Sequence, residues 1–222
     1  MGRKKLGRRN FLGRVTTAVL GGSVLVSCTG HSAGEEHTHT HDHQDHSQSG
    51  NKLAENRKMP RDLVMKLLDQ KAGQYMHISF NCAQSSFLAL QEQFGLPGDK
   101  ILKALTPLTG IAERGETCGA VTGSLMVIGL LYGRGKSRLS DWESYRASLV
   151  PAGKFCEQFE KKYGSTMCCK IQEKRFGRCF RLTRSSDLKA FQAEGATDKC
   201  SLVVQDAVKM AANIILDDEE LV

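Results

Sequence analysis

Apolar residues recur with the spacing of amphipathic helices along most of the chain after residue 58, and few segments alternate in the way a half-buried strand would. The expected helices are a segment that begins at Pro60 and contains Leu63–Leu68, then Ala83–Phe94, a short one around Ile101–Leu105, Cys118–Tyr132, Trp142–Phe159 and Val203–Ile214. We therefore predict a compact all-α domain of about six helices over residues 57–222.

The segment Cys118–Tyr132 is apolar nearly all round, as expected of a central buried helix. Pro151 predicts a kink or break in the helix that begins at Trp142. Four glycines in and just after the central segment would let neighbouring helices approach closely: Gly119, Gly123, Gly129 and Gly133.

The positive charge of the chain is concentrated at its N-terminus. The 222 residues carry a formal net charge of +7, but the first 27 hold six basic residues and no acidic one, and the remainder is nearly balanced. Binding to a phosphate backbone is mainly electrostatic. We therefore expect no nucleic-acid partner.

Residues 1–28 have the parts of an export signal: a basic region, an apolar region over 11–26, and small residues before Cys28. Residues 8–12 (RRNFL) resemble a twin-arginine signal, and residues 25–28 (LVSC) resemble a lipobox, whose cysteine is lipidated. A transmembrane anchor is the alternative, but the apolar run is shorter than the ~20 residues that span a bilayer. We expect export by the twin-arginine route to the periplasmic or extracytoplasmic side, with a lipid anchor on Cys28.

Residues 29–56 are polar and rich in histidine. Six of the seven histidines lie between positions 31 and 46, among Ser, Gly, Thr and acidic residues, so this stretch cannot bury enough apolar surface to fold. We expect a disordered linker whose imidazoles bind Zn, Ni or Cu, and the alternative is a polar spacer. The candidate metal ligands are His37, His39, His41, His43 and His46.

Four of the eight cysteines fall at predicted helix starts, each shortly after a residue able to cap the helix: Asn81, Thr117, Ser165 and Asp198. A thiol in the first turn meets unpaired backbone N–H groups and the positive end of the helix dipole, which favours the thiolate. This pattern predicts one site assembled from helix ends by Cys82, Cys118, Cys168 and Cys200.

The residues around these cysteines resemble the redox-active four-cysteine family written C–GCAxxG–C–C. The matching stretches are NCAQS at 81–85, GETCGAVTG at 115–123, YGSTMC at 163–168 and DKC at 198–200. The likeness covers roughly residues 60–216, although its central stretch has the order C-G-A-x-x-G. It implies that Cys82, Cys118, Cys168 and Cys200 are the family's four cysteines. It also implies redox activity and, as partner, an oxidoreductase or transporter subunit, because some members are encoded beside such proteins.

Three further cysteines lie outside this pattern. Cys169 directly follows Cys168 and is an alternative occupant of the third position. Cys156 lies on an apolar stripe with Phe155, so we expect a buried, inert thiol there. Cys179 lies among arginines, which would lower its pKa.

Three functions remain open for the four cysteines. The first is a bound iron–sulfur cluster or other metal and a role as electron carrier or accessory to a membrane-side oxidoreductase, although the clustered spacing of ferredoxins is missing. The second is a dithiol that cycles with a disulfide, formed by Cys82 and Cys118 or by Cys168 and Cys200. The third is a pair of disulfides that only stabilise an exported domain. The cluster is the leading expectation.

A few other polar residues near the cysteines are weaker candidates. His77 is the only histidine after the linker, and it is either a ligand or proton carrier or, more commonly for a lone histidine, structural. Glu113 and Arg114 are expected to be solvated loop charges, with Arg114 able to tune a nearby thiolate. One histidine and no nucleophile elbow give no support for a Ser/His/Asp hydrolase.

Overall fold

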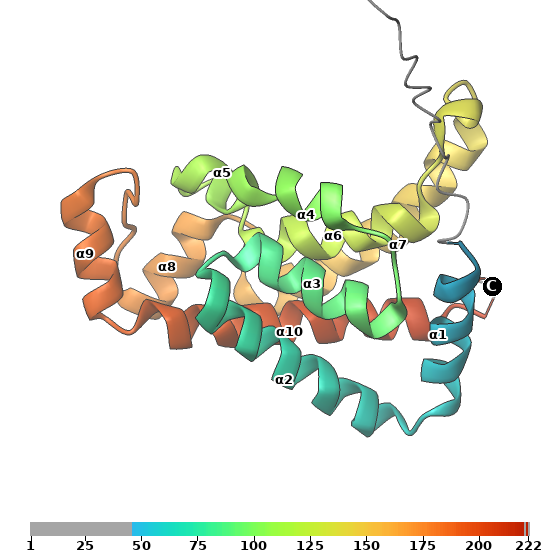
Figure 1. Ribbon diagram of the computed structural model, residues 1–222. Coiled ribbons are helices and arrows are strands. Elements are labelled where there is room, and N and C mark those ends of the chain that lie inside the picture. The colour runs from blue at the N-terminus through green and yellow to red at the C-terminus, as the bar shows by residue number, and fades with distance from the viewer. Residues whose placement is uncertain (1–45, 220, 222) are drawn as a thin grey trace, which may run out of the picture. The chain divides into compact units, whose positions relative to one another are not determined.

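The computed structural model describes residues 46–219 and 221, with side chains from Lys52 onward (Figure 1). Within these residues the chain forms ten α-helices and two short 3-10 helices, and its β-type pairing is one isolated bridge between Thr117 and Met167. The prediction of an all-α fold is confirmed. The predicted export signal and residues 29–45 of the predicted linker lie outside the described residues.

The helices follow one another as α1 (His46–Lys58), α2 (Arg61–Ser79), α3 (Cys82–Phe94), α4 (Asp99–Ala104), η1 (Thr106–Leu108), α5 (Gly110–Glu113), α6 (Gly119–Tyr132), η2 (Lys136–Arg138), α7 (Trp142–Tyr163), α8 (Cys168–Phe176), α9 (Ser185–Ala193) and α10 (Ala196–Asp217). The six predicted helices correspond to α2, α3, α4, α6, α7 and α10. The sequence pattern did not predict α1, α5 and α9, and it indicated only the start of α8, at Cys168.

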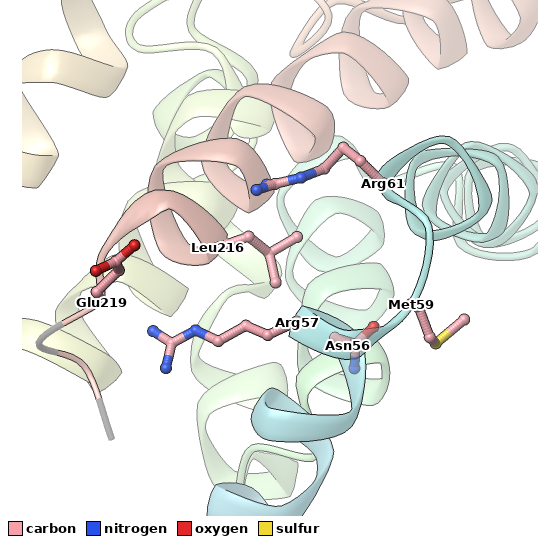
Figure 2. Close-up of a pocket in the computed structure, with 6 residues that line it drawn as sticks. All are labelled: Asn56, Arg57, Met59, Arg61, Leu216 and Glu219. Atoms are coloured by element: carbon pink, nitrogen blue, oxygen red, sulfur yellow. The ribbon is translucent and has the colours of Figure 1, made fainter.

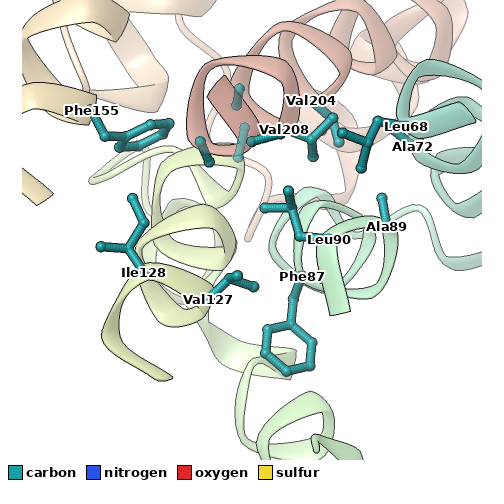
Figure 3. Close-up of a cluster of buried hydrophobic side chains, with 14 of the residues drawn as sticks. Leu68, Ala72, Phe87, Ala89, Leu90, Val127, Ile128, Phe155, Val204 and Val208 are labelled. Atoms are coloured by element: carbon teal, nitrogen blue, oxygen red, sulfur yellow. The ribbon is translucent and has the colours of Figure 1, made fainter. Parts of the chain in front are cut away.

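The hydrophobic core lies where α3, α6 and α10 pack against one another, with α2 and α7 covering it. Each of these five helices contributes fully buried side chains, among them Leu68, Leu90, Ile128, Phe155 and Val208 (Figure 3). Truncation of such a side chain typically costs about 2–5 kcal/mol of stability. This core therefore holds the helix ends that carry the cysteines in fixed positions.

Two glycines bring α3 and α6 into close contact. A Cβ atom on Gly123 would overlap the carbonyl oxygen of Ala83, and one on Gly119 would overlap Cys82 Sγ and lie 2.7 Å from the Ala83 nitrogen. The close approach predicted for the glycines of the central helix thus occurs at Gly119 and Gly123. It does not occur at Gly129, whose added Cβ would have no neighbour within 4 Å.

Two predicted boundaries were wrong. The linker was predicted to extend to residue 56, but α1 begins at His46 and buries Leu53 and Asn56. Asn56 Nδ2 donates to the carbonyl of Gln93 at 2.8 Å, so contacts with α3 stabilise a segment that is polar by composition. Of the kink or break predicted at Pro151, the break is absent, because α7 continues through this residue and the second half of the helix is anchored in the core.

The last turn of α10 packs beside the junction of α1 and α2. The side chains there line a polar pocket: Asn56, Arg57, Met59, Arg61, Leu216 and Glu219 (Figure 2). Arg61 forms an ion pair with Asp217 at 2.8 Å, and Arg57 donates to the backbone carbonyl of Asp218. These contacts join the two ends of the described chain.

None of the helices in the described part of the chain combines the length and apolar character needed to cross a membrane.

Candidate functional site

The four cysteines singled out by the sequence lie around one small enclosed cavity. Cys82 comes from α3, Cys118 directly precedes α6, Cys168 comes from α8 and Cys200 from α10. The remaining wall consists of apolar groups such as Val203 together with the polar residues Gln172 and Arg175. The cavity has a volume of about 30 Å³, which suits one or two water molecules. The fold therefore brings together residues that are up to 118 positions apart in the sequence.

Three of these cysteines lie at the start of a helix. Cys82 and Cys168 are the first residues of α3 and α8, and Cys118 is the residue before α6. The expectation was wrong for Cys200, which is the fifth residue of α10 because that helix begins at Ala196. Its thiol lies beyond the unpaired N–H groups of the first turn.

Asn81 is the one predicted cap that holds its helix in the expected way. Its side-chain oxygen accepts the backbone N–H groups of Ala83 and Gln84, both at 3.1 Å. This fixes the entry of α3 and thereby the direction of Cys82. The other three predicted caps are not the capping residues, because their helices begin at different positions: Thr117, Ser165 and Asp198.

Backbone hydrogen bonds tie the starts of α6 and α8 together. The amide of Cys118 donates to the carbonyl of Thr166 at 2.8 Å, and the amide of Cys168 donates to the carbonyl of Glu116 at 2.7 Å. These bonds surround the isolated bridge and hold Cys118 and Cys168 at the same cavity. The predicted pattern of helices gave no signal of this contact.

Cys82 is the thiol of the site whose pKa lies closest to neutral pH. A hydrogen bond from the thiol of Cys118 is the largest influence and lowers the pKa of Cys82 from 9.0 to about 7. Burial opposes this shift, while Thr109, whose Oγ1 lies 2.9 Å from the sulfur, and the backbone N–H of Gly119 support it. Hydrogen bonds to the charged form thus outweigh desolvation at Cys82.

The other three thiols are held in their neutral form. Donation to Cys82, together with burial, raises the pKa of Cys118 well above 9.0. Burial and then the charge of Cys82 raise the pKa of Cys200 to about 12, and the same two causes raise that of Cys168 further. The expectation that all four sites favour thiolate was wrong, because the interior penalises a second negative charge beside Cys82.

Thr109 begins a segment with unusual backbone geometry. The four residues of α5 all have positive φ: 56° at Gly110, 46° at Ile111, 55° at Ala112 and 60° at Glu113. Residues other than glycine pay roughly 1–2 kcal/mol each for this left-handed conformation. The turn is held by a hydrogen bond from the Glu113 amide to the Thr109 carbonyl at 2.9 Å, and it positions the Thr109 hydroxyl beside Cys82.

A second pocket, of about 270 Å³, opens onto Cys82, Cys168 and Cys200 but not onto Cys118. Cys118 is only 6% exposed and reaches only the enclosed cavity. A molecule in the open pocket therefore meets Cys82 before Cys118. We call this the open pocket below.

Cys169 and Cys179 form a disulfide with their Cα atoms 4.9 Å apart. The proposed alternative of Cys169 at the third position is thus wrong, because successive residues of a helix point about 100° apart and only Cys168 faces the cavity. The expectation of a low-pKa thiol at Cys179 is also wrong, because its sulfur belongs to the disulfide and has no proton to lose. Neither residue was predicted to pair, because connectivity does not follow from spacing.

Of the remaining candidates, Glu113 lies near the thiols of the site and the others lie away from them. Cys156 is half-buried on α7, and burial raises its pKa. His77 Nε2 lies 3.4 Å from Asp198 Oδ1 on the exposed surface, and His77 lines neither the cavity nor the open pocket. Glu113 lines the open pocket, whereas Arg114 is exposed and lines neither.

Three polar residues of the site escaped sequence analysis, one of them Arg175, which lines the enclosed cavity. Thr109 contacts Cys82, and Gln172, which is 2% exposed, donates its Nε2 to Cys168 Sγ at 3.4 Å while its Oε1 accepts the amide of Phe180 at 2.8 Å. Gln172 lies one turn after Cys168 on the same face of α8, so helical spacing was the signal that would have found it.

Within residues 52–219, no three or more His, Cys, Asp or Glu side chains are grouped as a metal site requires. Of the candidate ligands in the linker, His37, His39, His41 and His43 lie outside the described residues, and His46 is the first residue of α1.

Comparison with known proteins agrees with the site. No curated protein sequence and no solved structure matches the chain. One family model, described as "Putative redox-active protein (C_GCAxxG_C_C)", matches residues 80–214, a segment that contains all four cysteines around the cavity. Because the match spans more than half of the chain, the protein belongs to this C_GCAxxG_C_C family.

Proposed function

We propose that the protein is a thiol–disulfide redox protein in which Cys82 is the nucleophile and Cys118 the resolving thiol. The observation that carries this proposal is that Cys82 and the buried Cys118 line one enclosed cavity, where donation from Cys118 lowers the pKa of Cys82 to about 7. A thiolate attacks a disulfide most effectively when its pKa lies near the ambient pH.

The reaction consumes a disulfide of a partner molecule as oxidant. The Cys82 thiolate attacks one sulfur of that disulfide, forms a mixed disulfide and releases the first thiolate. Cys118 then loses its proton and attacks the Cys82 sulfur, which forms the Cys82–Cys118 disulfide and releases the second thiolate. Overall the protein dithiol is oxidised by two electrons and the partner disulfide is reduced to two thiols, and the reverse sequence oxidises a partner dithiol.

Cys168 and Cys200 differ from Cys82, and resemble Cys118, because their raised pKa values keep them protonated near pH 7. Both line the open pocket and both influence the cavity electrostatically. As neutral thiols they stabilise the negative charge of Cys82 less than a cation would. They exchange with the Cys82–Cys118 disulfide only after one of them has lost its proton.

The test is the pH dependence of alkylation of the reduced protein by iodoacetamide, followed by peptide mass spectrometry. We expect Cys82 to be half-maximally reactive near pH 7, with Cys118 unreactive until well above pH 9. Substitution Cys118→Ser should move the midpoint for Cys82 upward, because the strongest donor to its thiolate is lost. Mild oxidation of the wild type should yield a Cys82–Cys118 disulfide in the peptide map.

A matched control is Cys156→Ser, which removes a thiol that lines neither the cavity nor the open pocket. It should leave the Cys82 midpoint unchanged. A Cys82 midpoint near 9, or an oxidised map in which Cys168–Cys200 forms and Cys82–Cys118 does not, would contradict the assignment of the pair.

A cofactor site is the second candidate, favoured by the convergence of four cysteines on one cavity. Four cysteine thiolates are the usual ligands of a [4Fe–4S] cluster, and a bound cluster would supply one-electron transfer. The donor types fit this group, but the cavity of about 30 Å³ does not, since it is only large enough for water. The helix ends would have to separate for these sulfurs to become its ligands.

Iron and acid-labile sulfide per chain, with a visible spectrum of protein prepared anaerobically, test the cofactor. Roughly four irons and four sulfides per chain would establish a cluster and displace the dithiol proposal. A colourless protein with trace iron and a Cys82–Cys118 disulfide on oxidation would support the dithiol.

We further propose that the protein acts outside the cytoplasm, tethered by lipid on Cys28, as an accessory to a membrane-side oxidoreductase or transporter. The support is the twin-arginine-like and lipobox-like stretches of the first 28 residues. Intact-mass analysis of the membrane fraction should find a lipid on Cys28, and Cys28→Ser should release the protein from membranes. Replacement of both Arg8 and Arg9 by Lys should retain the precursor in the cytoplasm.

The histidines of the linker are proposed to bind a divalent metal. Deletion of residues 31–46 should abolish binding of Zn, Ni or Cu to the full chain without changing the alkylation midpoint of Cys82. Unchanged metal binding would make the segment a spacer.

A further inference from the structure

The open pocket has side walls that are largely apolar. The residues that form these walls come from segments far apart in the sequence. Met76 and Phe80 lie at the end of α2, Leu182 in the loop after α8, and Leu188 and Phe191 on α9. The sulfurs of Cys82, Cys168 and Cys200 complete it.

Charge is scarce in the open pocket. Glu113 is the one charged side chain among its lining residues, and it is an acid. The Cys82 thiolate adds a second negative charge. An anionic disulfide entering the pocket would lose hydration against apolar walls and meet two like charges, both of which are unfavourable.

Phe80 marks the entrance. It is the residue after α2, has a φ of 52° and is 71% exposed, so its ring stands at the rim with its apolar surface in contact with water. Together with Phe191 it provides aromatic surface for a ring or alkyl group, at a gain of roughly 25 cal/mol for each Å² of apolar area buried.

From these features we infer that the open pocket binds an uncharged, apolar disulfide and presents it to Cys82. This inference rests on the proposed dithiol function and names the substrate class for it. The disulfide lies against Leu188 and Phe191 with one sulfur toward Cys82. The first leaving thiol departs through the open pocket, and Cys118, which lines the enclosed cavity but not the open pocket, then attacks the Cys82 sulfur.

The experiment compares two aromatic disulfides that differ in charge, 4,4′-dithiodipyridine (neutral at pH 7.5) and 5,5′-dithiobis(2-nitrobenzoate) (dianionic). The rate ratio of neutral to anionic probe is measured for the reduced protein and for 2-mercaptoethanol, which corrects for intrinsic reactivity. We expect the ratio for the protein to exceed that for the small thiol on the order of ten-fold or more, the usual scale of discrimination by an apolar pocket.

Leu188→Glu places a charge on the pocket wall and should remove most of this preference. Leu202→Glu is the matched control, since Leu202 is 54% exposed on α10 and lines neither the cavity nor the open pocket. Circular dichroism verifies folding of both, and Phe191→Ala is the second variant if Leu188→Glu unfolds. Glu113→Gln should raise the rate of the anionic probe selectively.

Equal corrected ratios for the wild type and 2-mercaptoethanol, or an unchanged ratio in both Leu188→Glu and Phe191→Ala, would overturn the inference. The alkylation midpoint of Cys82 and the Cys82–Cys118 disulfide in the peptide map do not depend on which disulfides the pocket prefers. A midpoint near pH 9 or the absence of that disulfide would overturn the dithiol function, whereas an unselective probe ratio alone would remove only the substrate class.

Discussion

Cys82 and Cys168 occupy the same position in their helices, yet the fold gives their thiols opposite properties. Each is the first residue of its helix, where the helix dipole favours a thiolate. The pKa of Cys82 is lowered to about 7, whereas burial and the charge of Cys82 strongly raise that of Cys168. Position at a helix start therefore does not decide the charge of a buried thiol.

Hydrogen-bond donors make the difference. Cys82 receives donors from a thiol, a hydroxyl and two backbone amides, while Cys168 receives one side-chain amide, from Gln172. The Cys118 thiol and the Gly119 amide come close to Cys82 because Gly119 has no side chain to separate α6 from α3. The two sides of the site can be called the α3–α6 side, with Cys82 and Cys118, and the α8–α10 side, with Cys168 and Cys200.

Gly119→Ala should break the α3–α6 side and have the largest effect. The new methyl group would overlap the sulfur of Cys82 and the backbone of Ala83, so we expect a loss of about 3 kcal/mol in the free energy of unfolding. The alkylation midpoint of Cys82 should also rise as its donors move away. Urea unfolding measures the first effect and iodoacetamide labelling the second.

Gly129→Ala is the matched control for this prediction. Gly129 lies on the same helix with open space around it, and alanine is the better helix former by about 1 kcal/mol. We expect unchanged or slightly increased stability and an unchanged Cys82 midpoint. Equal effects of the two substitutions would show that close contact at Gly119 is unimportant.

Removal of the disulfide should affect the α8–α10 side next most strongly. The bond closes a loop of 10 residues, so replacing both Cys169 and Cys179 with Ser should cost about 2.5 kcal/mol by the loop-entropy estimate. The thiolate at Cys82 should be unaffected, because none of its donors belongs to that loop. Thermal unfolding tests the first statement, and a shifted alkylation midpoint would refute the second.

The pH dependence of stability should reveal the single lowered pKa. The pKa of Cys82 is about 7 in the folded state against 9.0 when unperturbed, so its contribution to stability is present above pH 9 and is lost as the pH falls through 7. For the anaerobic, dithiol form we expect the free energy of unfolding to increase by about 1.5 kcal/mol between pH 7 and pH 8.5 relative to Cys82→Ser.

Above pH 9 the other thiols should reverse this trend. The raised pKa values of Cys118, Cys168 and Cys200 mean that their contribution to stability is present below pH 9 and is lost at higher pH, because the unfolded chain ionises first.

The outcome that would contradict the prediction for Cys82 lies at lower pH. A stability profile for the wild type that runs parallel to that of Cys82→Ser from pH 7 to 8.5 would be incompatible with a thiolate at Cys82.

Cys200→Ala should have the smallest effect on the nucleophile. Cys200 does not donate to Cys82, so the alkylation midpoint should stay within about 0.3 pH units of the wild-type value, which corresponds to about 0.4 kcal/mol. A larger upward shift would show that the two sides are coupled through hydrogen bonds rather than separated as described.

Local signals in the sequence were sufficient for most of the helices and for the identity of the four cysteines. Helical periodicity predicted the helices of the core, and Asn81 was correctly predicted to cap α3. The same signals could not predict the charge of each thiol, because Thr109 lies 27 residues from Cys82 and reaches it only through tertiary packing. The Cys169–Cys179 bond was likewise invisible, since spacing does not specify pairing.

The left-handed turn at 110–113 gives the molecule a local preference for the opposite chirality. A D-amino acid favours positive φ for the same steric reason that an L-amino acid avoids it. In a chain assembled by chemical ligation, D-alanine at position 112, where φ is 55° and ψ is 39°, would fit without the conformational cost that L-alanine pays. The turn that positions Thr109 beside Cys82 is thus a left-handed element built from L-amino acids, and the rest of the fold offsets its conformational energy.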